Sequence, residues 1–335
     1  MSFEKYNEIE NTYNDKLIEK ARFNGLGNIE CICAVKIDGA NFQAGINEND
    51  EFFVGTRNQE LSVNSDFSNW QNVMKKYDVE RKIRKIKAEL GASKLIVYGE
   101  LCGGLYRHPD VPKVPNAVRI QGRVDYSPDN EWVPFDIKAD GKFISQDEVK
   151  RLCDEVGLLS QQVVFRGTME ECLKFDPVFQ DTTGNYFWGL PLIENNVAEG
   201  VVIKPVNAVF IGESRIIFKN KTPKFKERIR KTKEENKSNG LNELEQTWLD
   251  KILEYINESR VYSALSKLSG KVEFGTLMRA VIDDAMSEFR KENGDELDAV
   301  ERSTDPKDFS WKNIGKQLST ETIKVVRPIF LKECL

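Results

Sequence analysis

One short segment of this 335-residue chain places a lysine where it can act as a nucleophile. Lys36 follows the apolar run from Ile32 to Val35 and precedes Asp38 and Gly39. A buried lysine normally has its charge paired, so a lysine at the end of a buried strand is unusual. It attacks an electrophile only as the neutral amine, which is scarce at neutral pH because the pKa of free lysine is ~10.4. Burial and a nearby cation, such as a bound metal, favour that neutral form, and Gly39 permits a phosphate or a backbone segment to approach closely.

Two other interpretations of this segment have to be weighed. A β-hairpin with an Asp-Gly turn and a surface lysine explains the same residues, because short motifs often match by chance. A protein kinase would have a glycine-rich loop before the lysine, with His-Arg-Asp and Asp-Phe-Gly after it. The single histidine, His108, is followed by proline, and Asp-Phe-Gly does not occur. The phosphate-loop pattern Gly-x4-Gly-Lys-Ser/Thr does not occur either, so both phosphoryl-transfer classes are excluded.

Functional side chains recur at the ends of later apolar segments, each of which has the composition of a strand. In chain order they are Arg57, Glu100, Phe135 with Asp136, Glu199 and Lys204 of a Glu-Gly-x-x-x-Lys segment, and Lys219 with Lys221. Lys-x-Asp-Gly is a weak signal alone, but five such motifs in this order are specific. The series resembles the nucleotidyltransferase motifs of ATP-dependent ligases and capping enzymes. Over essentially its whole length, the chain resembles the RNA ligase 2 family, the double-strand RNA ligases of phages and of kinetoplastid RNA editing.

The resemblance implies ligation by three nucleotidyl transfers. Lys36 attacks the α-phosphorus of ATP, the AMP passes to a 5′-phosphate, and a 3′-hydroxyl then displaces it. Lys219 and Lys221 would be catalytic with Lys36, because they would neutralise the α-phosphate in the transition state. Glu199 would bind a metal, Mg²⁺ or Mn²⁺, or hold the surroundings of the lysine.

The resemblance also implies a set of nucleotide-binding residues: Ile37, Asn41, Arg57, Glu100, Phe135 and Lys204. Asn41 and Arg57 would contact phosphate or ribose, since arginine binds phosphate through two parallel hydrogen bonds. Glu100 would bind the ribose hydroxyls and Phe135 would stack on adenine. Taken singly, Phe135 also fits an ordinary core position, and Arg57 with Glu100 also fits a structural ion pair.

The expected macromolecular substrate is nicked double-stranded RNA. Arg260, Asp284 and Glu288 fall where the family has residues needed for action on a nicked duplex, although a solvated helix face explains them as well. The run from Lys219 to Lys237 is rich in lysine and arginine, which suits either a phosphate-backbone track or a solvated linker.

Asp38 and Ala34 depart from the family pattern. Many RNA ligase 2 relatives have histidine at the position of Asp38, and some have arginine at that of Ala34. Aspartate is what DNA ligases have, so a general polynucleotide ligase remains an alternative. A GTP-using capping enzyme and a non-catalytic nick-binding protein are two more.

Composition sets limits on the class of protein. The chain is 40% hydrophobic and 31% charged with a formal net charge of −5, as in ordinary globular proteins. Its six cysteines form no Cys-x-x-Cys pair, and Cys31 and Cys33 are expected to be small core residues on one face of a strand. Without a membrane-length apolar run or a signal peptide, we expect a monomer without membrane contact, in the cytoplasm or, if phage-encoded, the host-cell cytoplasm.

The pattern of apolar residues predicts an α+β protein with two domains. Residues 1–235 are expected to form a nucleotidyltransferase domain built on antiparallel sheets. After a polar break, helical spacing indicates an all-helical domain over residues 240–335, including helices over 274–286 and 322–331, the last kinked or ended at Pro328. DNA ligases and capping enzymes have a β-barrel in this place, so the helical pattern favours the RNA ligase 2 type.

Overall fold

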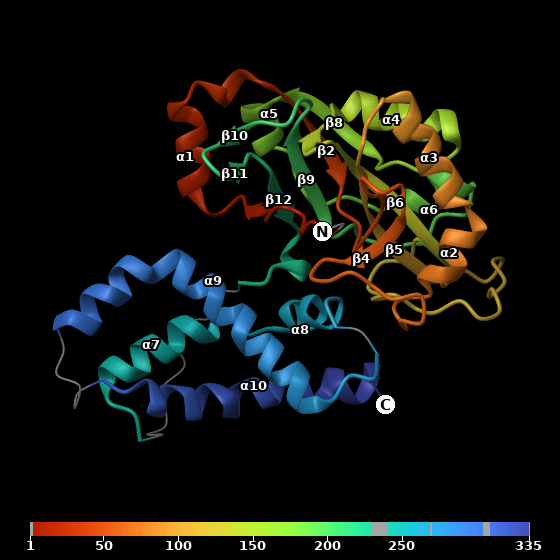
Figure 1. Ribbon diagram of the computed structural model, residues 1–335. Helices are drawn as coiled ribbons and strands as arrows, with labels where there is room; N and C mark the ends of the chain where they lie inside the picture. Colours follow the sequence, from red (N-terminus) through yellow and green to blue (C-terminus); the bar gives the residue numbers. More distant parts are fainter. Residues whose placement is uncertain (1–2, 229–239, 269, 304–308, 335) are drawn as a thin grey trace. The chain divides into compact units, whose positions relative to one another are not determined.

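The computed structural model describes residues 3–228, 240–268, 270–303 and 309–334 (Figure 1). It divides into two compact units, Met1–Pro223 and Lys224–Leu335. The first unit combines two five-stranded sheets with helices, and the described part of the second consists of four α-helices joined by loops. The α+β class with a helical C-terminal region is therefore confirmed. The expected domain boundary, between residues 235 and 240, falls almost entirely within residues 229–239, which lie outside the described part. Residues 224–228 belong to the second unit.

Two sheets form the centre of the first unit. The first sheet has the order β1 (Glu10–Asn11), β12 (Phe218–Lys221), β9 (Gly200–Pro205), β2 (Glu30–Val35) and β8 (Val163–Thr168). The second has the order β4 (Phe52–Thr56), β3 (Ala40–Ile46), β5 (Leu95–Leu105), β6 (Ser127–Ala139) and β7 (Lys142–Phe143). A separate hairpin joins β10 (Phe210–Ile211) to β11 (Ser214–Arg215). Neighbouring strands are antiparallel except β1 and β12.

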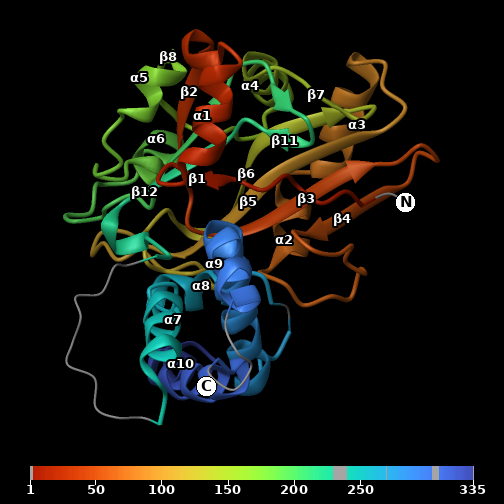
Figure 2. The ribbon, with the colours of Figure 1, turned by 90° about the vertical axis from the view of Figure 1, so that its left-hand side faces the viewer.

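The alternation of side chains along each strand defines the faces of the sheets. Cys31 and Cys33 of β2 point to the outer face of the first sheet, as expected, and pack there against α1 (Asp15–Phe23) and α5 (Met169–Leu173). The outer face of the second sheet packs against α2 (Trp70–Lys76), α3 (Val79–Glu89) and α4 (Gln146–Val156). Figure 2 shows these helices around the sheets.

The inner faces of the two sheets meet in a third apolar cluster. Its members include Tyr6 from the N-terminal segment, Ile96 and Tyr98 of β5, and Ile217 with Val202 from the first sheet. Residues of β2, β9 and β12 whose side chains share this inner face therefore point toward β3, β4, β5 and β6. This interface between the sheets is where the functional side chains collect.

The second unit packs four helices around its own core. They are α7 (Glu243–Leu253), α8 (Glu258–Leu265), α9 (Phe274–Ser303) and α10 (Trp311–Glu333). Both long helices exceed the predicted ranges 274–286 and 322–331. A kink or an end was expected at Pro328, and the end is wrong, because α10 continues beyond that residue. A proline so near the end removes one backbone hydrogen bond, and the buried Ile329 still anchors the last turns in the core.

Candidate active site

Lys36 directly follows β2 and lies on the inner face of the first sheet. Ile32 and Ala34, which share its side of the strand, pack away from the outer-face cluster. The backbone N–H of Lys36 donates to the carbonyl of Gly200 at 2.9 Å, and this hydrogen bond joins the end of β2 to β9. Gly39 lies against the second sheet so closely that a Cβ atom would stand 2.2 Å from the Leu101 carbonyl oxygen. The segment after Lys36 therefore needs glycine because β5 occupies the space of a side chain.

Glu199 is shared by two of the expected catalytic lysines. One carboxylate oxygen lies 2.9 Å from Nζ of Lys36 and the other lies 3.0 Å from Nζ of Lys221. Burial would raise the pKa of Glu199, but the charges of Lys221 and Lys36 outweigh it and hold that pKa below its usual value. Gly200 follows with φ of 143°, a conformation in which a Cβ atom would stand 2.1 Å from the Asn220 carbonyl oxygen. The Glu-Gly pair thus lets β12 approach closely enough for Lys221 to reach Glu199.

Lys219 belongs to the same inner face. It is paired with Val202 across β12 and β9, and Ile217, two residues earlier, packs between the sheets. Lys219 and Lys221 therefore point to the side on which Lys36 lies.

Polar side chains from the second sheet face this group. The register of β3 with β5 sets Asn41 opposite Glu100, and Arg57 follows β4, which pairs with β3 on its other side. Among the described residues, the side chains of Glu100 and Arg57 have no hydrogen-bond partner, and the buried Oδ1 of Asn41 has none. Burial, with the nearby carboxylates of Glu199 and Asp38, raises the pKa of Glu100 to about 8 against the opposing charge of Lys36. Unpartnered polar groups at the edge of a packed interface are the residues that a bound ligand would satisfy.

Phe135 reaches the interface through an irregularity in β6. Tyr98 pairs with Asp136 and its neighbour Gly99 pairs with Pro134, so Phe135 is the extra residue of a β-bulge. A bulge bends its strand and re-aims a side chain. The Phe135 ring consequently packs edge-on against Tyr6, with centroids 5.1 Å apart, and joins the cluster between the sheets while staying partly exposed.

The phosphate contact expected of Lys204 does not agree with its surroundings. The side chain is 1% exposed, and Nζ donates to the Phe135 carbonyl at 2.6 Å and lies 3.3 Å from Asp136. Arg215 and Tyr6 bind the same carboxylate, at 2.9 Å and 2.5 Å. Burial lowers the pKa of Lys204 to about 8, and the two cations hold the pKa of Asp136 at about 2 in spite of its burial. Lys204 thus supports the strand of Phe135 and has no free face for a phosphate.

A loop that the sequence did not assign to the site holds the segment after Lys36. Arg123 forms a bidentate ion pair with Asp38, including an Nε–Oδ2 distance of 2.9 Å. The backbone N–H of Asp38 donates to the Tyr126 hydroxyl at 2.7 Å, and Gln121 donates to the Gly39 carbonyl at 3.4 Å. Burial raises the pKa of Asp38, although Arg123 opposes the shift. The signal in the sequence was the arginine content of this loop, but nothing local paired Arg123 with Asp38.

In the second unit, Arg260, Asp284 and Glu288 do come together, but not as an exposed nucleic-acid surface. Arg260 is 0% exposed, and its guanidinium binds Asp284, Glu288 at 2.5 Å, and the carbonyl of Tyr255 at 2.7 Å. A side chain so enclosed has no donor to offer a phosphate. The guanidinium of Arg260 is therefore not a surface donor, and the three residues join α8 to α9. Their expected importance for action on a nicked duplex stays a prediction.

The basic run from Lys219 to Lys237 is described only as far as Arg228. Arg228 lies 3.1 Å from Glu254 and 2.7 Å from Glu292, so its charge is compensated within the second unit. Lys224 and Lys226 are exposed. Residues 229–237 lie outside the described part, and the phosphate track expected there stays a prediction.

The two-sheet fold and the grouping of Lys36, Glu199 and Lys221 opposite Glu100 and Phe135 agree with a lysine nucleotidyltransferase. The chain belongs to the RNA ligase family, whose profile matches residues 29–221. A second profile, that of the C-terminal domain of T4 RNA ligase 2, matches residues 238–324. Together the two matches make the chain a member of the RNA ligase 2 family.

Individual relatives match part of the chain. The mitochondrial RNA-editing ligase 2 of Trypanosoma brucei brucei is 32% identical over 235 residues, 60% of this chain and 55% of that protein. RNA-editing ligase 1 of the same organism is 30% identical over 243 residues, 61% of this chain and 50% of that protein. The matched region thus spans about half the length of these relatives. A Naegleria gruberi RNA ligase mutant solved with ATP and Mn aligns with a TM-score of 0.48 at 17% identity, over 67% of this chain and 57% of that one. None of the described helices is long and apolar enough to cross a membrane.

Proposed function

We propose that this chain is an ATP-dependent RNA ligase that seals 3′-hydroxyl/5′-phosphate nicks in duplex RNA through AMP bound covalently to Lys36. The observation that carries the proposal is the shared ion pair in which Glu199 holds Lys36 and Lys221 side by side. It places a candidate nucleophile next to a cation suited to the charge that develops on a phosphorus under attack.

In the first step, a neutral Lys36 Nζ would attack the α-phosphorus of ATP. The N–P bond forms, the P–O bond to pyrophosphate breaks, and the amine nitrogen releases one proton to solvent. Glu199 would orient the lysine before attack, while Lys219 and Lys221 would stabilise the negative oxygens of the α-phosphate. The AMP would then pass to the 5′-phosphate of the nick and leave when the 3′-hydroxyl attacks.

The unpartnered groups fit ATP. Phe135, aimed inward by the bulge, offers a face for adenine, while Glu100 offers two oxygens for the ribose hydroxyls. Arg57, whose guanidinium has no partner among the described residues, could bind a phosphate, and the Oδ1 of Asn41, likewise unpartnered there, is a further acceptor. Ile37, which is 8% exposed, would pack against the nucleotide.

The residues also fit a divalent ion that arrives with the nucleotide. No cluster of three or more candidate metal ligands occurs among the described residues. Mg²⁺ commonly binds through one or two carboxylates together with phosphate oxygens and water, so such a cluster is not required. Glu199 is the proposed carboxylate, and Mg²⁺ or Mn²⁺ would supply additional positive charge at the phosphates.

Nicked double-stranded RNA is the proposed partner, since the matched relatives are RNA-editing ligases. Asp38, the residue typical of DNA ligases, keeps a general polynucleotide ligase as the second candidate. We further propose that the chain acts as a monomer in the cytoplasm, or in the host-cell cytoplasm if a phage encodes it.

The decisive measurement for the nucleotide is the intact mass after incubation with Mg²⁺ and either ATP or GTP. Addition of one AMP that depends on Lys36 supports the ligase. Addition of GMP alone would instead indicate a capping enzyme, and no adduct with either nucleotide would leave a nick-binding protein.

The measurement for the nucleic acid uses matched nicked duplexes whose 3′-hydroxyl strand is RNA or DNA, at one fixed salt concentration. Preference for RNA is expected because A-form shape and 2′-hydroxyls distinguish it from DNA. Equal sealing of both, or faster joining of unpaired strands, would refute the duplex-RNA assignment.

A further inference from the structure

The exposed face of α10 has a composition different from the rest of its unit. The helix contains five cationic residues, at positions 312, 316, 324, 327 and 332, but only two acidic residues. At about 100° per residue, Lys312, Lys316 and Arg327 lie within about 60° of one another around the helix axis. All three are exposed, while Ile314, Leu318 and Ile329 on the other side are buried in the core. We call these three residues the α10 basic row.

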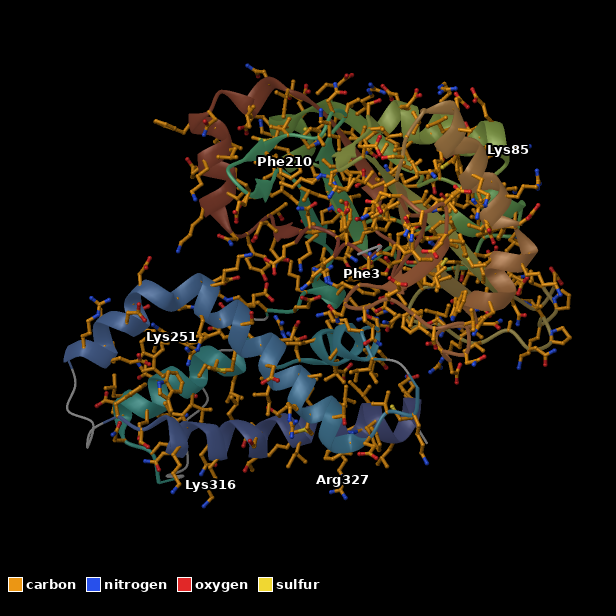
Figure 3. All side chains as sticks on the ribbon, in the orientation of Figure 1. Phe3, Lys85, Phe210, Lys251, Lys316 and Arg327 are labelled. Atoms are coloured by element: carbon orange, nitrogen blue, oxygen red, sulfur yellow. The ribbon has the colours of Figure 1, made fainter. Side chains whose placement is uncertain are left out.

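The charges of the α10 basic row are not compensated by neighbours. Among the described residues, none of the three has an ion pair or hydrogen bond through its side chain. The acidic residues of α10 bind other cations, since Glu321 lies 2.6 Å from Lys324 and Glu333 lies 3.3 Å from Lys332. Figure 3 shows Lys316 and Arg327 on the same side of α10, pointing away from α9.

The neighbouring long helix has a mixed surface. Near its C-terminal end, α9 exposes Asp295, Glu296 and Asp298, but it also exposes Arg290, Lys291 and Arg302. Glu296 lies 2.6 Å from Lys251, and Asp298 lies 3.8 Å from Arg302, so these two acids have cations of their own. A mixed surface of this kind serves solubility, whereas three exposed cations in one row, without such partners among the described residues, suit a partner of the opposite charge.

We propose that the α10 basic row binds the phosphate backbone of the RNA duplex beside the nick, an inference that rests on the proposed function. Lys312 and Arg327 are 15 residues apart, which corresponds to about 22 Å along a helix at 1.5 Å per residue. In duplex DNA the phosphates of one strand recur roughly every 3.4 Å along the axis, and at a comparable spacing in RNA the row extends past about six of them. Lysine and arginine contacts of this kind fix position without reading sequence, as a ligase for varied nicks requires.

The test compares two triple variants of the full chain that lose the same charge. The row variant is Lys312→Ala/Lys316→Ala/Arg327→Ala, and the control is Lys20→Ala/Lys85→Ala/Lys142→Ala, whose lysines are exposed but lie on three separate elements of the first unit. Affinity for a nicked RNA duplex, made unsealable by a 3′-deoxy end, is measured by fluorescence anisotropy between 50 and 200 mM KCl.

The slope of log K against log[salt] is negative, and each lost contact should make it less steep by about 0.9. The slope of the row variant should therefore be less steep by about two to three. At 100 mM KCl the row variant should bind at least about tenfold more weakly than the wild type. The control should lose less than half as much. Adenylation by ATP should be unchanged, and Lys312→Arg/Lys316→Arg should bind like the wild type because it keeps the charges.

Equal losses in the two triple variants would overturn the inference, because they would show diffuse attraction and no defined track. An unchanged affinity in the row variant would also overturn it and would indicate that the row serves another partner, such as an acidic protein. Neither result touches the proposed function. A wild-type chain that adenylates but shows no salt-dependent duplex binding would overturn the inference alone, whereas failure to adenylate would overturn the ligase assignment.

Discussion

Replacing Glu100 by glutamine should stabilise the ligand-free protein at alkaline pH and impair its reaction with ATP. Burial raises the pKa of Glu100 from 4.5 to about 8. Between those values the folded protein holds a proton that the unfolded chain has released, so the free energy of unfolding falls as the pH rises. At ~1.4 kcal/mol per pH unit, the loss between pH 5 and pH 8 amounts to about 3 kcal/mol as an upper value. Glutamine has no proton to lose, so Glu100→Gln should abolish this part of the pH dependence.

The assay is urea unfolding of both proteins at pH 5 and pH 8, monitored by circular dichroism. The difference in unfolding free energy between variant and wild type should grow by about 2 to 3 kcal/mol from the lower to the higher pH. Glu213→Gln, which alters an exposed glutamate of the same unit, should show no such growth. A pH-independent difference for Glu100→Gln, or a wild type that gains stability from pH 5 to pH 8 relative to the variant, would refute the reasoning.

Three further substitutions address the other parts of the site. Lys36→Ala should abolish the AMP adduct seen by mass spectrometry yet leave the circular dichroism spectrum unchanged; a normal adduct yield would disprove the nucleophile. Arg123→Ala should slow adenylation at least about tenfold, because Asp38 would be buried without its cation, and Arg123→Lys should restore part of the rate. Arg260→Met should destabilise the second unit by about 3 kcal/mol in urea unfolding, because it removes the buried cation that Asp284 and Glu288 share, and unchanged stability would contradict the buried network.

The sequence was informative where function and strand pattern coincide. Apolar runs bordered by a charged residue identified Lys36, Glu100 and Glu199, and the structure brings their strands to one interface. Lys36 directly follows β2 and Glu199 directly precedes β9, whereas Glu100 lies in the middle of β5. The pattern was useful because side chains alternate along a strand, which sets the face that each polar residue occupies. The edge strand β8 and the short helix α6 (Thr183–Trp188) escaped detection, since β8 is only partly buried and α6 is barely longer than one turn.

Contacts between distant segments were not accessible from the sequence. Arg123 lies 85 residues from Asp38, and no periodicity connects the two. Lys204 matched a motif position, but its actual partner, Asp136, comes from the other sheet. Arg260 likewise followed a family pattern, whereas its burial results from the packing of α8 against α9, which helical spacing alone does not fix. A sequence motif can therefore predict that a residue is important without predicting which residues it contacts.

The shared carboxylate of Glu199 makes the two lysines that bind it a single electrostatic unit. Removing Lys221 takes away one of the two lysines paired with Glu199, so the ion pair between that carboxylate and Lys36 changes as well. A Lys221 variant should therefore lose activity through the nucleophile as well as through any phosphate it binds. A double-mutant cycle of Lys221→Ala with Glu199→Gln, scored by adenylation rate, should be strongly non-additive, and simple additivity would show that the two act independently. Kinetic effects of substitutions here reflect Lys36, Glu199 and Lys221 together. Assigning a separate contribution to each residue would count the same interaction twice.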